Sequence, residues 1–169
     1  MCKYGISIGL LFIGLATVSC RQEEGGLQRM EQVIHFYIQN PQGGDLLNPN
    51  DSLGYANRVN FVDLNADRLD VQIGEVTPQI DEGGKNYLEY TAGATRVLVD
   101  SVKDQKKYIS DFVIKYQNRE GDTKSMSNDT LHVAYLWSPS IFRISEILLN
   151  RKKITEPTVG SPSKVVITK

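Results

Sequence analysis

The sequence contains few of the residues that hold small metal-binding or disulfide-stabilised domains together. It has two cysteines and two histidines among 169 residues, and one of the cysteines, Cys2, follows the initial methionine. A disulfide framework needs several cysteines, and a structural zinc site needs about four cysteine or histidine ligands. The composition therefore argues against both, and we expect neither a metal nor a cofactor.

An excess of charge of one sign and long apolar runs are also missing. Lys plus Arg number 19 and Asp plus Glu number 20, so the formal net charge is -1, and no basic stripe indicates a nucleic-acid partner. After residue 20 no stretch approaches the roughly 18 consecutive apolar residues that a transmembrane helix requires. What remains is a chain with 40% hydrophobic and 23% charged residues, which is typical of one globular domain.

The N-terminal residues have the three parts of a secretory signal. Lys3 supplies a positive charge, Gly5 to Val18 form an uncharged stretch of about 14 residues, and the small residue Ser19 follows. This stretch is too short to span a bilayer. Residues 1–19 are therefore predicted to be a signal peptide that is removed.

The residue after the expected cleavage site is a cysteine. The segment Thr17-Val18-Ser19-Cys20 resembles the lipobox of bacterial lipoproteins, and the resemblance implies that the Cys20 thiol carries a diacylglycerol group. The alternative is an ordinary signal peptide that leaves Cys20 as an incidental thiol. Acylation is favoured because Cys20 has no partner for a disulfide in the exported chain, and it would anchor the protein to a membrane.

A short polar segment follows the cysteine. It resembles the acidic export signal of surface lipoproteins in Bacteroidota-type bacteria, which implies display on the outer face of the outer membrane. A solvated tether is the alternative, and the following pair of glycines makes a flexible link under either interpretation. The residues of the implied export signal are Arg21, Gln22, Glu23 and Glu24.

These features divide the chain into three parts. Residues 1–19 are the expected signal peptide, residues 20–28 a lipidated flexible tether, and residues 29–169 a single domain. A chain of this length can bury roughly 68–70% of its unfolded surface, which is enough for a core without disulfide or metal support.

Within the domain, alternation of apolar and polar residues with period two predicts strands almost everywhere. In Tyr108–Gln117 and Thr130–Trp137 one face is clearly apolar, and Ile141–Leu149, although a helix is conceivable there, is predicted as a strand that turns through residues 150–152. The other expected strands are Val33–Ile38, Arg58–Leu64, Arg68–Gly74, Tyr87–Thr91, Thr95–Val102 and Lys164–Thr168.

Eight or nine short strands without a long helix predict an all-β fold, namely an antiparallel β-sandwich. An immunoglobulin-like topology is expected by analogy at the level of the fold. Taken with the lipobox and the acidic tether, the chain resembles small uncharacterised Bacteroidota lipoproteins with β-sandwich domains. That resemblance implies a location and a fold but no activity.

Candidate sites for ions are weak. The segment Asp63 to Asp67 begins like a calcium loop, but Arg68 stands where glycine is needed and Gly74 where a closing glutamate is needed, so a hairpin turn is favoured. Asp45, Asn48, Asn50 and Asp51 could also gather round an ion, but they lie in a long loop, and Asn, Asp, Gly and Pro are residues that any loop contains.

Catalytic patterns are equally scarce. His35 and His132 lie opposite the apolar faces of their strands, which predicts surface or groove histidines. No Gly-x-Ser-x-Gly elbow or phosphate loop occurs. We therefore expect a protein that is not an enzyme.

Aromatic residues are the only positive indication of binding. Tyr108, Phe112, Tyr116, Tyr135 and Trp137 lie on apolar faces and are expected in the core. Other tyrosines are less constrained by the alternation, and exposed rings on a sandwich can stack on sugars or anchor a protein. These are Tyr37, Tyr55, Tyr87 and Tyr90.

Two functions are therefore expected. The first is a non-catalytic interaction module for a glycan or protein, which should show a concave patch of at least two exposed aromatic residues flanked by Asn, Asp or Gln. The second is a structural subunit of an envelope complex or strand-exchange assembly, which should show an open edge strand or a large apolar patch.

Overall fold

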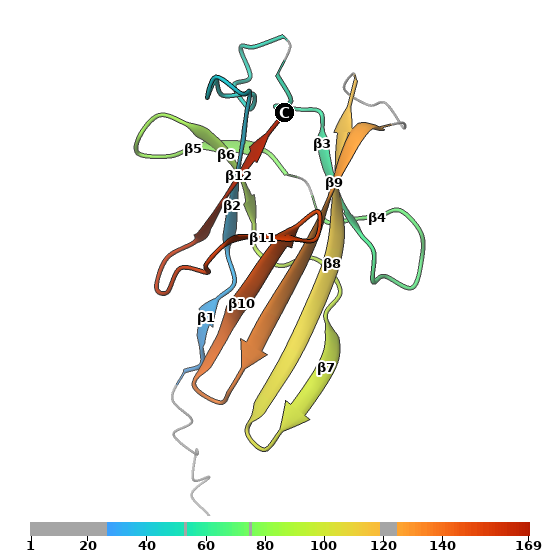
Figure 1. The fold of residues 1–169 in the computed structure, drawn as a ribbon, viewed down its shortest axis with the longest axis vertical. Coiled ribbons are helices and arrows are strands. Elements are labelled where there is room, and N and C mark those ends of the chain that lie inside the picture. The colour runs from blue at the N-terminus through green and yellow to red at the C-terminus, as the bar shows by residue number, and fades with distance from the viewer. Residues whose placement is uncertain (1–26, 53, 75, 119–124) are drawn as a thin grey trace, which may run out of the picture.

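The computed structural model describes residues 27–169 except 53, 75 and 119–124. Within this part of the chain the protein forms strands and no helix (Figure 1), which confirms the all-β prediction. The expected signal peptide, Cys20 and the export signal at residues 21–24 lie outside the described residues. The twelve strands are β1 (Arg29–Glu31), β2 (Ile34–Gln39), β3 (Val59–Asp63), β4 (Val71–Gln72), β5 (Pro78–Ile80), β6 (Asn86–Tyr90), β7 (Val97–Val102), β8 (Gln105–Gln117), β9 (Ser125–Trp137), β10 (Ile141–Leu149), β11 (Lys152–Thr155) and β12 (Ser163–Thr168).

Eight strands form a large sheet around the three long strands β8, β9 and β10. Its order is β1-β10-β9-β8-β3-β4, with β11 added to β10 and β7 added to β8. The long strand β8 has two partners along one edge, because β7 pairs with its first half and β3 with its second half. The first half of β8 therefore extends past β3 together with β7.

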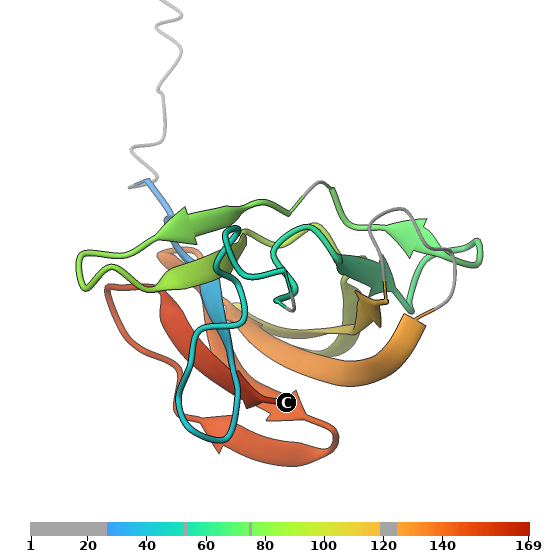
Figure 2. The ribbon, with the colours of Figure 1, turned by 90° about the horizontal axis from the view of Figure 1, so that it is seen from above.

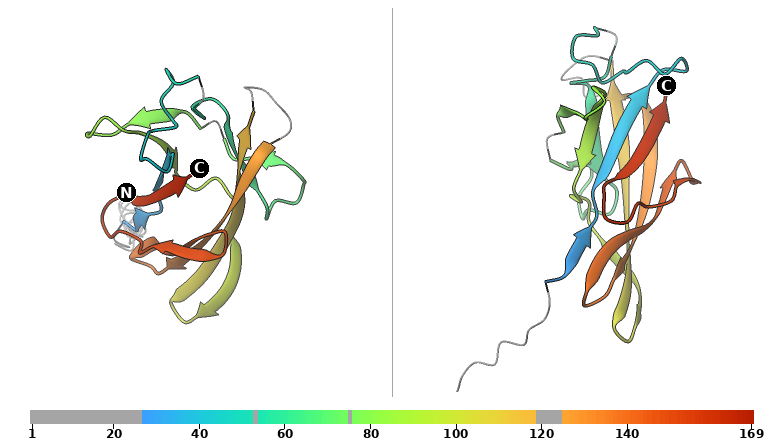
Figure 3. Two further views of the ribbon diagram at one scale, coloured as in Figure 1. Left: turned by 45° about the horizontal axis from the view of Figure 1, so that its top comes forward. Right: turned by 90° about the vertical axis from the view of Figure 1, so that its left-hand side faces the viewer.

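The other four strands form a small sheet with the order β12-β2-β6-β5. The two sheets lie against each other in a sandwich-like arrangement (Figures 2 and 3). Each sheet contains one parallel pair, β1 with β10 and β12 with β2, so both are mixed. Short strands joined by turns suggested antiparallel pairs throughout. The two parallel pairs were not predicted, because period-two alternation carries no information about strand direction.

Aromatic rings from both sheets meet in the core. Phe36 of the small sheet lies with its ring centroid 5.4 Å from Phe61 and 6.3 Å from Phe112 of the large sheet. Tyr90 stacks on Phe112 at 4.6 Å. Offset and edge-to-face contacts of this kind add to the free energy gained from burying the rings.

The expected apolar faces of the long strands are confirmed. Phe112 and Tyr116 of β8 and Leu131 and Tyr135 of β9 are fully buried, while Tyr108 and Trp137 are partly buried and pack on the core. The strand prediction for residues 141–149 and the hairpin that follows it are also confirmed.

One expected strand is largely absent. The segment Arg68–Gly74 contains only the two-residue strand β4, and Leu69 is 95% exposed rather than buried beside Val71 and Ile73. Asp70 adopts a positive φ of 55°, which an extended strand does not allow. The alternation of three apolar residues therefore did not identify a continuous strand here.

A buried carboxylate lies beside the side chain of Lys169. Asp129 of β9 accepts hydrogen bonds from the Tyr116 hydroxyl at 2.9 Å and the Asn150 amide at 2.7 Å, and the Lys169 ammonium lies 2.7 Å from it. Burial raises the pKa of Asp129, but these three contacts outweigh it and leave the pKa below the ordinary value of 3.8. This polar cluster links β8, β9 and the C-terminal residue.

Candidate functional site

The solvent-facing side of the small sheet carries an unusual set of side chains. In β2 the residues Ile34, Phe36 and Ile38 are buried in the core, so alternation directs His35 and Tyr37 to the outer face. In β6 the same rule buries residues 88 and 90 and directs residues 87 and 89 outward. We define the outer-face patch as His35, Tyr37, Tyr87, Glu89, Lys164 and Val166.

Strand pairing brings the aromatic rings of the patch together. His35 and Tyr87 stack with ring centroids 4.1 Å apart, and Tyr37 lies 5.8 Å from Tyr87. The Lys164 ammonium is 5.8 Å from the centre of the Tyr37 ring. These residues come from β12, β2 and β6, so three strands together form one aromatic surface.

Polar groups hold this surface in place. The His35 Nε2 atom lies 3.1 Å from a Glu89 carboxylate oxygen, and the Tyr87 hydroxyl donates to the Gln79 side chain at 3.0 Å. The Tyr37 hydroxyl donates to Asp81 at 3.1 Å. Each ring of the patch thus has one polar partner that fixes its orientation.

Asp81 is itself positioned by the turn between β5 and β6. One of its oxygens accepts hydrogen bonds from the backbone N–H groups of Gly83 and Lys85, both at 2.9 Å. The bond from the Lys85 N–H is the largest of several contacts that lower the pKa of Asp81. Burial and the bond to Asp81 raise the pKa of Tyr37 to about 12, so at neutral pH this phenol is a hydrogen-bond donor beside a carboxylate.

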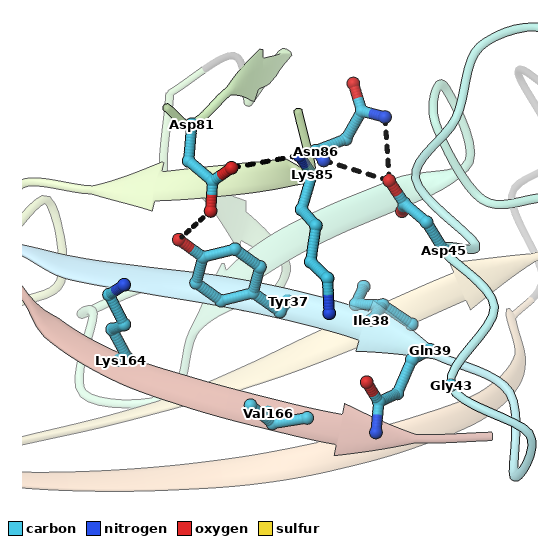
Figure 4. A pocket seen from close by; sticks show the side chains of 10 residues that line it. All are labelled: Tyr37, Ile38, Gln39, Gly43, Asp45, Asp81, Lys85, Asn86, Lys164 and Val166. Atoms are coloured by element: carbon cyan, nitrogen blue, oxygen red, sulfur yellow. Dashed lines mark hydrogen bonds between the residues drawn. The ribbon is translucent and has the colours of Figure 1, made fainter. Parts of the chain in front are cut away.

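A pocket of about 200 Å³ opens beside Tyr37 (Figure 4). Its wall includes the ring of Tyr37 and the apolar side chain of Val166, and the Lys85 side chain extends along it toward β2. The lining residues are Tyr37, Ile38, Gln39, Gly43, Asp45, Asp81, Lys85, Asn86, Lys164 and Val166. The pocket therefore combines an aromatic wall with carboxylates, amides and ammonium groups.

The loop that follows β2 completes the pocket. One Asp45 oxygen accepts hydrogen bonds from the backbone N–H and the side-chain amide of Asn86, at 2.9 and 2.8 Å, and the other accepts the Leu47 N–H at 2.8 Å. These bonds fix the loop against the start of β6. They also occupy the oxygens that the sequence suggested as weak candidates for binding an ion.

The other weak calcium candidate is a turn. The Asp63 carboxylate accepts the N–H groups of Asn65 at 2.8 Å and Thr95 at 2.7 Å, which is the role of an aspartate that begins a turn. Burial raises the pKa of Asp63, but its hydrogen bonds, led by those from Thr95, lower it overall. Among the described residues, no three His, Cys, Asp or Glu side chains gather as metal ligands.

The aromatic residues that the sequence left unassigned separate into two groups. Tyr37 and Tyr87 lie in the outer-face patch, as described above. Tyr90 is buried, and the half-buried Tyr55 packs on Tyr116 with ring centroids 5.2 Å apart. His132, on the outer face of the large sheet, is 2.7 Å from Asp111 and far from the patch in the sheet order.

An open edge strand is also present. All six residues of β7 are exposed, and it pairs only with β8. The register shifts between Leu98 and Asp100, so Val99 forms a bulge. Bulges on edge strands discourage pairing with another strand.

Sequence reasoning missed the partners that fix the patch. Gln79 lies in the three-residue strand β5, and Asp81 in the turn after it. Neither segment alternates long enough to be recognised as part of a sheet. The pairing of β5 with β6 brings Gln79 and Asp81 to the patch, and this pairing is seen only in the folded chain.

Comparisons with known proteins identify no relative. No protein family matches the sequence, no curated protein matches it, and no solved structure matches the fold at a significant level. In the described residues there is no helix that is long and apolar enough to cross a membrane.

Proposed function

We propose that this protein is a lipid-anchored, non-catalytic carbohydrate-binding module displayed on the outer membrane of a bacterial cell. The observation that carries this proposal is the outer-face patch with its adjoining pocket. It has two half-exposed tyrosine rings flanked by carboxylate and amide side chains, which is the arrangement expected of a sugar-binding surface. An immunoglobulin-like sandwich remains our proposal for the topology.

The chemistry of the patch suits a sugar ring. The faces of Tyr37 and Tyr87 offer apolar area to the C–H groups of a sugar, and aromatic residues provide this area with little loss of conformational freedom. Asp81 and Asn86 provide an acceptor and a donor at the pocket wall, and Lys85 provides a further donor. A pocket with a few fixed polar groups on an apolar wall is typical of small-molecule recognition.

The anchor and the location are proposals from the sequence. The lipobox at Cys20 and the following acidic segment support attachment and outward display. Protease shaving of intact cells tests both: wild type should be shaved, Cys20→Ala should leave the membrane, and Glu23→Ala/Glu24→Ala should stay membrane-bound but protected. Membrane attachment of Cys20→Ala would contradict the anchor.

Binding itself is tested with a glycan array probed by the full-length protein. Tyr37→Ala and Tyr87→Ala should each weaken binding to any recognised glycan by about fivefold, because a lost ring contact costs on the order of 1 kcal/mol. Tyr87→Phe keeps the ring and should retain most of the affinity. Leu69→Ala, at a residue that is 95% exposed and outside the patch, is the matched control.

Two binding results would contradict the proposal. A glycan that binds Tyr37→Ala and Tyr87→Ala as tightly as wild type would exclude the patch as its site. Another outcome is that no glycan is recognised but a protein ligand binds wild type and not the variant Tyr37→Ala/Tyr87→Ala. The proposed carbohydrate ligand would then be wrong, while the outer-face patch would still be the binding surface.

A further inference from the structure

Five strands of the large sheet have one of their ends on the same side of the molecule, next to the first described residues. Arg29 of β1 pairs with Ile141 at the start of β10, and Trp137 at the end of β9 pairs with Lys106 near the start of β8. Ser101 of β7 pairs with the same Lys106. We define this end as the entry end, and it lies at the bottom of Figure 1.

The entry end carries the densest group of exposed apolar residues in the described chain. Strand β7 shows no buried residue on either face, because its neighbour β8 extends beyond β3 at this point. Exposed apolar side chains that gather in one place usually mark an interaction surface. They are Val97, Leu98, Val99 and Val102, which are 41%, 51%, 48% and 60% exposed.

Strand pairing with a second copy does not explain this surface. The bulge at Val99 interrupts the regular spacing of backbone groups along the edge, and such bulges prevent continuous pairing. The exposed apolar side chains are therefore better covered by a surface that does not pair with the strand through backbone hydrogen bonds. A lipid surface has that property.

The predicted tether brings a lipid surface within reach. About nine residues separate Cys20 from Arg29, and an extended chain of that length spans at most roughly 30 Å. Five strands spaced about 4.8 Å apart cover only some 19 Å from β1 to β7. A bilayer that holds the lipid on Cys20 can therefore touch the β7 side of the entry end.

The polar residues of the entry end also fit a headgroup layer. The turn after Val102 carries Lys103, and Lys106 lies with its ammonium 4.8 Å from the centre of the Trp137 ring. Tryptophan and lysine side chains are common at the boundary between a bilayer and water. Asp100 and Asp104 offset part of this positive charge, so the apolar residues supply the main attraction.

We propose that the β7–β8 hairpin rests on the surface of the anchoring membrane, with Val102 and its apolar neighbours in the interfacial layer. This inference rests on the lipid anchor of the proposed function. It places the sugar-binding patch away from the membrane, because β2 runs from Ile34 near the entry end to Gln39 beside the pocket. The hairpin would thus turn the patch toward the medium.

A single thiol can test this contact. In the lipidated mature protein Cys2 has been removed with the signal peptide and the Cys20 thiol is acylated, so Val102→Cys provides one site for an environment-sensitive bimane label. The protein is reconstituted into vesicles of phosphatidylethanolamine and phosphatidylglycerol, with and without nitroxide-labelled lipid. We expect a blue shift of the emission and quenching by the nitroxide lipid.

The control label is placed at Ile80→Cys. Ile80 is 70% exposed, similar to Val102, but lies in β5 at the edge of the small sheet, beside the Asp81 turn. It should show neither the shift nor the quenching. In a second variant, Leu98→Asp/Val99→Asp with the label at residue 102, the shift should be lost, and both substitutions are at exposed sites that do not disturb the core.

The outcomes separate the two proposals. Equal signals at residues 80 and 102 in membrane-bound protein overturn the hairpin contact and leave the anchor intact. A blue shift at residue 102 without nitroxide quenching indicates a protein occupant and also overturns it, as does a shift that survives Leu98→Asp/Val99→Asp. Membrane attachment of Cys20→Ala overturns the anchor, and the hairpin contact that rests on the anchor falls with it.

Discussion

Two tyrosine–aspartate pairs, one inside the protein and one on its surface, use the same hydrogen bond for different purposes. Tyr116 donates to Asp129 at 2.9 Å in the interior, and Tyr37 donates to Asp81 at 3.1 Å on the outer face. In both pairs burial is the largest cause that raises the pKa of the phenol. The difference between them lies in what surrounds the carboxylate.

The inner carboxylate is held by side chains and the outer one by a turn. Asp129 has contacts with Asn150 and Lys169, which come from distant parts of the chain. Asp81 instead accepts backbone N–H groups from its own turn. The inner pair therefore joins separate elements and stabilises the fold, whereas the outer pair orients one exposed ring and leaves it accessible to a ligand.

The largest difference should appear when each carboxylate loses its charge. Asp129→Asn should lower the free energy of unfolding by about 2–3 kcal/mol, because the largely buried Lys169 ammonium then has no counter-charge. Asp81→Asn keeps an acceptor oxygen at a partly exposed site and should lower stability much less, because its partners are backbone N–H groups and a phenol rather than a largely buried ammonium. Urea unfolding of both variants measures this, and equal effects would refute the comparison.

Acid should remove the stabilisation that the inner carboxylate provides. The pKa of Asp129 is below 3.8 in the folded protein, so its ionised form stabilises the fold above the unfolded value and this stabilisation is lost as pH falls through the folded pKa. The difference in unfolding free energy between wild type and Asp129→Asn should therefore shrink below about pH 4. Thermal unfolding between pH 6 and pH 2 tests this, and a constant difference would contradict it.

Removing the hydroxyls gives a smaller contrast. Tyr116→Phe deletes a buried donor to Asp129 and should destabilise the protein by about 1–2 kcal/mol. Tyr37→Phe deletes a half-buried one and should shift the unfolding midpoint much less. If Tyr37→Phe proved as costly as Tyr116→Phe, the outer pair would be part of the fold rather than of the patch.

The smallest effect concerns the outer phenol alone. The pKa of Tyr37 is raised to about 12, after burial chiefly by Asp81. Asp81→Asn should lower this pKa without a change in fold, because the negative charge beside the phenol is gone. Titration of ¹³C-labelled tyrosine by NMR in wild type and Asp81→Asn would follow it, and an unchanged value would place the cause in burial only.

Alternation predicted the long strands well because one of their faces is buried along most of their length. Every second residue from 110 to 116 of β8 and from 129 to 135 of β9 is buried, and a period of two is not that of a helix. It failed at Leu69, where a positive φ at Asp70 ends the extended chain. It also missed β1 and β5, whose three residues are too few to show a period.

The candidate site could be predicted only in part. Alternation alone directs Tyr37 and Tyr87 outward once the inward faces of β2 and β6 are known. It cannot say that the two rings become neighbours, because they are far apart in the sequence and adjacent only through the pairing of β2 with β6. Asp81 was not recognised at all, since an aspartate in a turn is an ordinary turn residue.

The sequence by itself determined which face of the long strands enters the core, because period-two alternation is a local property of the backbone. The resemblance of residues 17–20 to a lipobox, on which the proposed anchor rests, is likewise a property of the linear sequence. The tertiary structure alone decided the two parallel pairs, the joining of the patch across three strands and the burial of Asp129 beside Lys169. These depend on contacts between distant segments, which form only when the two sheets pack around their shared core.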